Sequence, residues 1–323
     1  MSKKLQIVVT HCNETLAEVH PLLDSIDIQQ NVNFDDIGVV IVNDGGNSLK
    51  GRLPEYRFET EHIDIEKAGV SAARNAGLDA VTADYVMFCD CDDMFANVCG
   101  LWIIMREIEK GFDLFISSFI EETRDRTNGS VVYINHDFDL TFVHGKVHRV
   151  QFLKKNGIRW NPDLTVHEDS FFHLLAQRLS SDTKHCPTPF YLWKWRDGSV
   201  CRRDPLYMLK TYRDLIKSSA ALVRELSSRG RLDAAAEIVV QMTYDSYFTM
   251  NKEEWLNQDN QQYRVDTERA FAAYRREFMI LYNSVQKETR DRLVMGIKNR
   301  MFSEGVVLEK ITFDDWIKRV EAL

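Results

Sequence analysis

The sequence predicts an α/β domain, with a mostly parallel sheet flanked by helices, followed by an all-helical domain. Short apolar runs typical of buried strands alternate with amphipathic stretches at helical spacing as far as residue 204. Beyond the dipeptide Asp204-Pro205, only helical periodicity continues. We therefore expect a first domain over residues 1–204 and a second domain over residues 205–323.

Each element follows from its pattern of apolar residues. Strands are expected where these residues are continuous or alternate, over residues 5–10, 37–42, 63–65, 85–89, 114–120, 131–135 and 190–195. Helices are expected where they recur every three or four positions, over residues 15–25, 69–80, 97–110, 149–156 and 167–179. The second domain shows the same helical spacing over residues 206–226, 231–250, 266–284, 288–301 and 312–323. The alternation in the first domain predicts helices on both faces of its sheet.

Composition and charge exclude several classes of protein. The 323 residues are 44% hydrophobic and 28% charged, which provides a packed core and excludes general disorder. The net charge is −8, with −9 on residues 1–204 and +1 on residues 205–323, which argues against a globally basic nucleic-acid binder. No apolar run approaches the roughly 18 residues that span a bilayer, and we expect no signal peptide. Because the six cysteines form no CxxC pair, we expect reduced thiols and a cytoplasmic location.

Three carboxylates follow the predicted strand over residues 85–89. Asp90 and Asp92 are two residues apart, so their side chains point the same way in an extended segment, and Asp93 is adjacent. Converging carboxylates repel one another unless a cation lies between them, and a hard divalent ion is the natural partner. A solvated acidic turn at the end of the strand explains the triplet equally well.

Other polar residues are expected at the same edge of the sheet, because ligands bind at the carboxyl ends of parallel strands. Asp44 follows the strand over residues 37–42, and the segment Thr10-His11-Cys12-Asn13-Glu14 ends the first strand. Glu168-Asp169 opens a predicted helix. Each of these has an ordinary structural role, as a turn residue, a helix cap or a first-turn acid. Their ordered occurrence favours a binding site.

These motifs together resemble glycosyltransferase family 2 over about residues 5–203. The resemblance rests on Val-Val-Thr-His-Cys-Asn at 8–13, Val-Asn-Asp-Gly-Gly at 42–46, Lys-Ala-Gly-Val-Ser-Ala-Ala-Arg-Asn-Ala-Gly at 67–77, Phe-Cys-Asp-Cys-Asp-Asp at 88–93, Gly-Lys-Val-His-Arg at 145–149, His-Glu-Asp at 167–169 and Trp-Arg-Asp-Gly-Ser-Val at 195–200. Two positions depart from the family pattern. The family usually has tyrosine or phenylalanine where Cys12 stands and aspartate where Asn43 stands.

The resemblance implies a GT-A fold for the first domain and a nucleotide-sugar donor, with UDP as the expected nucleotide. It places the nucleobase against Thr10 and Asp44, with Arg74 nearby, and the ribose against Asp90. It assigns to Asp92 a Mn²⁺ or Mg²⁺ ion that bridges the diphosphate. The remaining donor-side residues that it implies are Asn13, Glu14, Glu168, Arg196 and Ser199.

The resemblance also implies that Asp169 is the general base. A carboxylate within hydrogen-bond reach of an acceptor hydroxyl can take its proton, which contributes about 10²–10⁴-fold to the rate. One such base suffices for direct displacement with inversion at the anomeric carbon, whereas a covalent route needs a second carboxylate. A divalent ion would stabilise the charge that develops on the leaving diphosphate.

We expect a metal-dependent inverting glycosyltransferase that acts on a hydroxyl group of a glycan or its precursor. The helical domain is expected to bind the acceptor or to form a homo-oligomer. Two alternatives stay open: transfer to a hydroxylated base of DNA, and a non-catalytic scaffold that binds a nucleotide sugar. Lys146 and His148 either line the acceptor side or lie on the surface. The alternating Tyr191, Trp193 and Trp195 either form a platform for a sugar or are partly buried.

Overall fold

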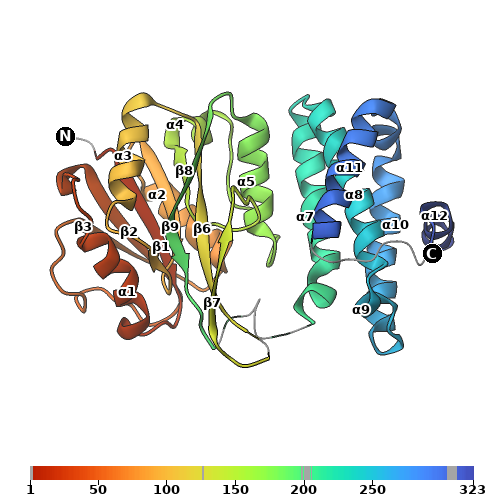
Figure 1. Ribbon diagram of the computed structural model, residues 1–323. Coiled ribbons are helices and arrows are strands. Elements are labelled where there is room, and N and C mark those ends of the chain that lie inside the picture. The colour runs from red at the N-terminus through yellow and green to blue at the C-terminus, as the bar shows by residue number, and fades with distance from the viewer. Residues whose placement is uncertain (1–2, 126, 198, 200–203, 205, 304–310) are drawn as a thin grey trace. The chain divides into compact units, whose positions relative to one another are not determined.

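The computed structural model describes every residue except 1–2, 126, 198, 200–203, 205 and 304–310 (Figure 1). The chain divides into two compact units, Met1–Ser199 and Val200–Leu323. The predicted boundary at Asp204-Pro205 lies close to this division, and Pro205 is outside the described residues. All described strands belong to the first unit, and the described elements of the second unit are helices.

The first unit is built around a mixed sheet. Its described strands have the spatial order β3 (Glu59–Ile65), β2 (Ile37–Asp44), β1 (Leu5–His11), β4 (Tyr85–Asp90), β8 (Lys146–Arg149), β6 (Leu114–Arg124), β9 (Thr183–Trp193) and β5 (Met94–Phe95), with β7 (Val131–His136) paired to β6. The first four strands are parallel, and so are β6 and β9. The α/β prediction is confirmed. The sheet is less uniformly parallel than expected because β8 runs antiparallel to both β4 and β6.

Helices cover the sheet, as predicted. They are α1 (Leu16–Asp27), α2 (Val70–Ala80), α3 (Gly100–Lys110), α4 (Val150–Lys155) and α5 (Glu168–Leu179), with a short 3₁₀ helix, η1 (Phe34–Asp36). α2 packs on β1 and β2. A Cβ added to Gly77 would lie 2.3 Å from a methyl carbon of Val8, so the small residues of α2 allow this close packing. α2 therefore crosses the two strands whose ends carry candidate site residues.

The apolar runs that predict the strands fill the core of the first unit. One cluster joins Ile7 and Val9 of β1 with Leu22 of α1 and with Leu101 and Ile104 of α3, and all five side chains are fully buried. The intervening residues of each strand face the opposite side of the sheet, since side chains alternate along a strand. Burial on both faces explains why these strands appear in the sequence as continuous apolar runs.

The second unit is a set of helices. They are α7 (Tyr207–Ser228), α8 (Leu232–Met250), α9 (Glu253–Leu256), α10 (Gln261–Ser284), α11 (Lys287–Ser303) and α12 (Phe313–Glu321), with a 3₁₀ helix, η2 (Gln258–Asn260). The helical prediction is confirmed, although α10 begins before residue 266. The core of the second unit contains the buried aromatic residues Trp255, Phe271 and Trp316. Throughout the described part of the chain, no helix combines the length and hydropathy needed to cross a bilayer.

Candidate active site

Three parallel strands bring polar residues to one edge of the sheet. β1 ends at His11, β2 at Asp44 and β4 at Asp90. In the register of the sheet, Thr10 pairs with Asp90 on one side and with Val42 on the other. Thr10, Asp44 and Asp90 are therefore neighbours at the carboxyl ends of the strands, where open α/β sheets bind their ligands.

The loops after β1 and β2 are in close contact. A Cβ on Gly46 would lie 1.1 Å from the carbonyl oxygen of Cys12, so only glycine fits at this position. The side-chain nitrogen of Asn43 donates to the carbonyl oxygen of Gly46 (2.9 Å) and to the carboxylate of Asp64 (2.8 Å). The backbone N–H of Gly46 in turn donates to the side-chain oxygen of Asn43 (2.9 Å). Asn43, one of the departures from the family pattern, thus fixes the loop after β2 to β3.

Asp44 holds the start of α2. One of its carboxylate oxygens accepts from the backbone N–H of Ala68 (2.7 Å), and the other accepts from the N–H of Gly69 (3.0 Å). A carboxylate at a helix N-terminus is stabilised by the orphan N–H groups there. These bonds set where α2 begins, and the position of α2 determines where its one buried arginine lies.

Arg74 connects the acids of two elements that are far apart in the sequence. Its side chain is buried, at 3% exposure. One guanidinium nitrogen, Nη2, donates to Asp90 (2.9 Å), and the other, Nη1, donates to Glu168 (3.1 Å) and Asp169 (2.5 Å). The guanidinium also lies over the ring of Trp160, 4.5 Å from its centroid. These acids raise the pKa of Arg74, so the guanidinium is a permanent cation at the centre of the site.

Glu168 and Asp169 form the first turn of α5, as predicted. Burial raises the pKa of Asp169 well above its usual range, because its desolvation outweighs the attraction of Arg74, and Glu168 beside it acts in the same direction as burial. A carboxylate with a raised pKa has a higher proton affinity than an exposed aspartate. Asp169 is therefore suited to accept a proton from a hydroxyl group.

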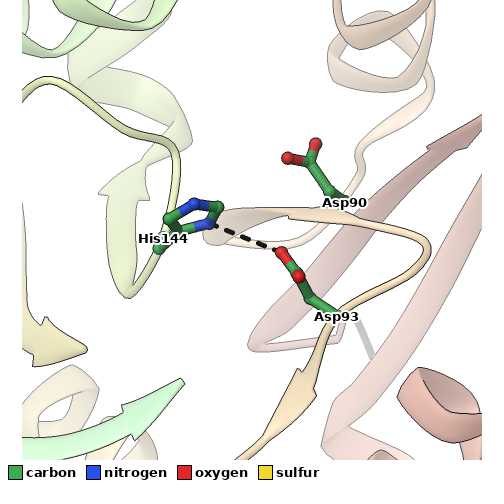
Figure 2. A group of neighbouring side chains, drawn as sticks. All are labelled: Asp90, Asp93 and His144. Atoms are coloured by element: carbon green, nitrogen blue, oxygen red, sulfur yellow. Dashed lines mark ion pairs between the residues drawn. The ribbon is translucent and has the colours of Figure 1, made fainter. Parts of the chain in front are cut away.

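Asp93 is the most enclosed member of the acidic triplet, at 1% exposure. Its carboxylate accepts from the Tyr191 hydroxyl (2.7 Å) and from the backbone N–H of Lys194 (3.0 Å), and His144 Nδ1 lies 3.6 Å away (Figure 2). Burial raises the pKa of Asp93 well above its usual range, and the charges of Asp90 and Asp92 add to this. Asp93 thus ties β9 to the loop that follows β4.

Asp92 lies on the more open side of the triplet, with a side-chain exposure of 29%. Arg196 lies 3.1 Å from Asp92 and 3.2 Å from Glu14, so it bridges the loop after β1 and the loop after β4. Glu14 also accepts from the backbone N–H of Cys12 (2.8 Å). Burial and then the charge of Asp90 raise the pKa of Asp92, while Arg196 lowers it. The charge of Arg196 thus partly offsets an acidic cluster that favours a cation.

One group of side chains within the described part of the chain could hold a metal ion. Asp90, Asp93 and His144 each offer a ligand atom, and these atoms lie within 4.8 Å of one another. Asp92 adds a carboxylate that is less enclosed than Asp93. Sequence reasoning missed His144, because a single histidine between two predicted elements carries no spacing signal. Oxygen-rich sets of this kind suit Mg²⁺ or Mn²⁺.

The structure links most of the residues predicted for the site. Arg74 contacts Asp90, Glu168 and Asp169. Arg196 contacts Glu14 and Asp92, and Thr10 and Asp44 lie at the adjacent strand ends. Asn13 is exposed in the loop after β1. The Ser199 N–H donates to the carbonyl oxygen of Arg196 (3.0 Å), and the neighbouring residues 198 and 200 lie outside the described residues.

Two further interpretations from the sequence are resolved by burial. Lys146 and His148 are 1% and 0% exposed, so the expectation that they lie on the surface is wrong. They belong to β8, an internal strand of the sheet, and the ring of His148 packs against Phe172 of α5. Tyr191 is fully buried, whereas Trp193 and Trp195 are half-buried. These three alternating aromatic residues are therefore partly buried, which agrees with one of the two interpretations of the sequence.

Several known proteins are similar to this chain. The glycosyltransferase GlyA of Streptococcus pneumoniae serotype 4 is 41% identical over 101 residues, which cover 30% of this chain and 14% of GlyA. The chain spans less than two thirds of the length of the curated relatives that it matches. The crystal structure of S. aureus TarS 1-349 in complex with UDP-GlcNAc has a TM-score of 0.63 at 16% identity, covering 95% of this chain and 93% of TarS 1-349. The mannosyltransferase PcManGT from Pyrobaculum calidifontis, in complex with GDP-Man and Mn²⁺, has a TM-score of 0.51 at 12% identity, covering 99% of this chain and 84% of PcManGT.

These structural likenesses confirm the GT-A fold. The sequence model of glycosyl transferase family 2 matches residues 6–179, which are more than half of the chain. The match contains the three strand ends, Arg74 and the Glu168-Asp169 pair. The chain therefore belongs to glycosyltransferase family 2.

Proposed function

We propose that this glycosyltransferase moves a sugar from a UDP-sugar to an acceptor hydroxyl group, with inversion at the anomeric carbon and with the help of a divalent metal ion. The observation that carries the proposal is the position of Arg74, which binds Asp90 at a strand end and Asp169 at the start of α5. Arg74 thereby holds Asp90, on the donor side, and Asp169, the candidate base, at fixed positions relative to each other. The complex of TarS with UDP-GlcNAc supports a uridine nucleotide as the donor.

The donor would lie across the carboxyl ends of β1, β2 and β4. We assign the nucleobase to Thr10 and Asp44, whose carboxylate also holds α2, and the ribose to Asp90. Arg196 would bind the diphosphate, because it is a cation on the open side of the acidic cluster. The other donor contacts that we propose come from Asn13, Glu14, Glu168 and Ser199.

The acidic cluster fits a divalent ion. Three carboxylates, Asp90, Asp92 and Asp93, lie together, and each of the last two has a raised pKa because the charges repel and are buried. We propose that Asp92 holds the ion, with Asp93 and His144, which lie in one group with Asp90, as the alternative ligands. A bound ion supplies charge stabilisation to the leaving diphosphate. The complex of PcManGT with GDP-Man and Mn²⁺ supports this use of a metal.

Asp169 is the proposed general base. Its carboxylate is held by Arg74 at 2.5 Å, which fixes its orientation at the start of α5. In direct displacement, the acceptor oxygen attacks the anomeric carbon, its proton passes to Asp169, and the nucleoside diphosphate leaves from the opposite face. This single displacement inverts the configuration at the anomeric carbon and needs only one base. We propose a glycan or its precursor as the acceptor, and a role for the helical unit in acceptor binding or homo-oligomerisation.

The proposal is tested first on the donor. A panel of nucleotide sugars is screened by thermal shift and calorimetry, with and without Mn²⁺. We expect one UDP-sugar to stabilise the protein in a metal-dependent manner, and Asp92→Ala to remove the metal dependence. Stabilisation by no UDP-sugar would contradict the proposal.

The base is tested by release of UDP from the bound donor, with water as the acceptor. Asp169→Asn should slow this release by about 10²–10⁴-fold while leaving donor affinity nearly unchanged. Asp163→Asn is the matched control, because Asp163 is an exposed carboxylate in the loop before α5. Equal rates for Asp169→Asn and the control would show that Asp169 is not the base.

A further inference from the structure

A cavity lies at the edge of the sheet opposite the candidate active site. Its volume is about 1010 Å³, and it is lined by the residues just before β1 and β4, the last turn of α3, and the segment from the end of β8 into α4. Tyr85 lines the cavity and Asp90 lies in the active site, at the two ends of β4. Five steps along a strand span about 17 Å, so the cavity is separate from the donor site.

The lining of the cavity is basic, although the protein as a whole carries a net charge of −8. Its cationic residues are Lys4, Lys110, Arg149, Lys154 and Lys155, against the acids Asp84 and Glu109. The cavity therefore concentrates positive charge in the unit of the chain that is otherwise the more acidic. Clefts lined by one sign of charge attract ions of the opposite sign.

Three of these cations keep their charge available. Lys154 and Lys155 are exposed, and within the described residues neither lies in a direct ion pair; the nearby carboxylate of Asp79, which the charge of Lys154 also reaches, is bound by Arg159 (2.6 Å). Arg149 donates from Nε and Nη2 to the hydroxyl of Tyr85 (3.3 and 3.1 Å), which orients the guanidinium without cancelling its charge. By contrast, Lys4 and Lys110 lie 3.1 Å from Asp36 and 2.6 Å from Glu107. Arg149 is thus a fixed cation with two lysines beside it on α4.

We propose that this cavity binds a phosphate-bearing ligand with at least two negative charges, at a site separate from the nucleotide-sugar site. An oriented guanidinium with neighbouring lysines is the donor set that recognises phosphate oxygens. The volume of about 1010 Å³ is at the upper end of ordinary ligand pockets, so it readily admits a small organic phosphate. The same phosphate chemistry is offered by a free phosphorylated molecule and by the headgroup of an anionic lipid.

The test measures binding of pyrophosphate and of glycerol 3-phosphate by calorimetry, with EDTA present so that no divalent ion recruits phosphate to the acidic cluster. Lys154→Ala/Lys155→Ala is compared with Lys50→Ala/Arg52→Ala, which removes two exposed cations from the segment between β2 and β3. Both pairs change the net charge equally. We expect the first pair to weaken binding at least about tenfold and the second pair to leave it unchanged.

A second measurement uses sedimentation with vesicles that contain phosphatidylglycerol. Binding of the soluble phosphates identifies a free ligand, and binding of the vesicles alone, lost in Lys154→Ala/Lys155→Ala, identifies a lipid headgroup. Arg149→Gln should weaken whichever binding is found, since it removes the oriented cation. If neither probe binds, or if the two double variants lose binding equally, the proposal is wrong.

Discussion

Replacing His148 by phenylalanine should make the protein less sensitive to acid. His148 is fully buried on β8, and neither of its ring nitrogens has a hydrogen-bond partner in the described part of the chain. Its ring stacks on His173 of α5 at 5.3 Å and contacts Phe172 edge-on at the same distance. Burial, and then the charge of Lys146, lowers the pKa of His148 to about 3. The folded protein therefore holds this imidazole in its neutral form.

The size of the effect follows from the difference between the folded and unfolded states. In the unfolded chain a histidine has a pKa of about 6.5, so below that pH the unfolded state takes up a proton that the folded state does not. The stability due to neutral His148 is thus present above pH 6.5 and is lost as the pH falls toward 3. Between pH 7 and pH 5 the loss from this one residue is about 2 kcal/mol. His173 acts in the same direction, because burial and the charge of Lys146 also lower its pKa.

Urea unfolding at pH 7 and at pH 5 measures this difference. Between the two pH values, His148→Phe should lose about 2 kcal/mol less stability than the wild-type protein. His185→Phe is the matched control, because His185 is exposed on β9, and it should behave as the wild type. An equal loss in His148→Phe and in the wild-type protein would refute the reasoning. Because His173 and Asp169 both belong to α5, we also expect Asp169 to leave its position in the site when the wild-type protein unfolds in acid.

Three further substitutions test, by urea unfolding at pH 7, the contacts that hold the site residues in place. Arg74→Met should cost about 3–5 kcal/mol, because it leaves the enclosed carboxylates of Glu168 and Asp169 without their cation; a loss below about 1 kcal/mol would contradict the importance of these ion pairs. Tyr191→Phe should cost about 1–3 kcal/mol, because Asp93 loses a donor; an unchanged midpoint would count against that bond. Gly46→Ala should cost at least about 1–3 kcal/mol through its collision with the Cys12 carbonyl, and a fully stable variant would show that the two loops can separate.

The fold could be predicted from the sequence where burial is uniform. The strands that contain Val8 and Val40, β1 and β2, are buried on both faces, so their apolar runs are continuous and their positions are clear. The acidic residues after them could be placed at one edge because parallel strands end together. The register that pairs Thr10 with Asp90 agrees with that placement, although no sequence pattern states the pairing itself.

The sequence did not reveal β8, because its residues look like surface residues. Lysine is rarely buried and histidine is buried only at an intermediate frequency, so Lys146 and His148 produce no strand signal. The structure keeps Lys146 buried through a hydrogen bond from its Nζ to the carbonyl oxygen of His144 (2.9 Å) and through the nearby charges of Asp139 and Asp169. Burial still lowers the pKa of Lys146 to about 8. Such compensation depends on residues from other elements, which a pattern along one strand does not contain.

The same reasoning explains why Arg74 could be named from the sequence but its role could not. The family resemblance places Arg74 near the nucleobase. In the structure its partners are Asp90 and also Glu168 and Asp169, which lie more than ninety residues from Arg74 along the chain. One arginine can donate hydrogen bonds to three carboxylates at once only if the elements that carry these carboxylates are held in place. Here α2 is fixed by Asp44 and α5 by its packing on β8. The orientation of the candidate base therefore depends on the whole sheet edge, and we expect variants that loosen α2 to impair catalysis without touching Asp169 itself.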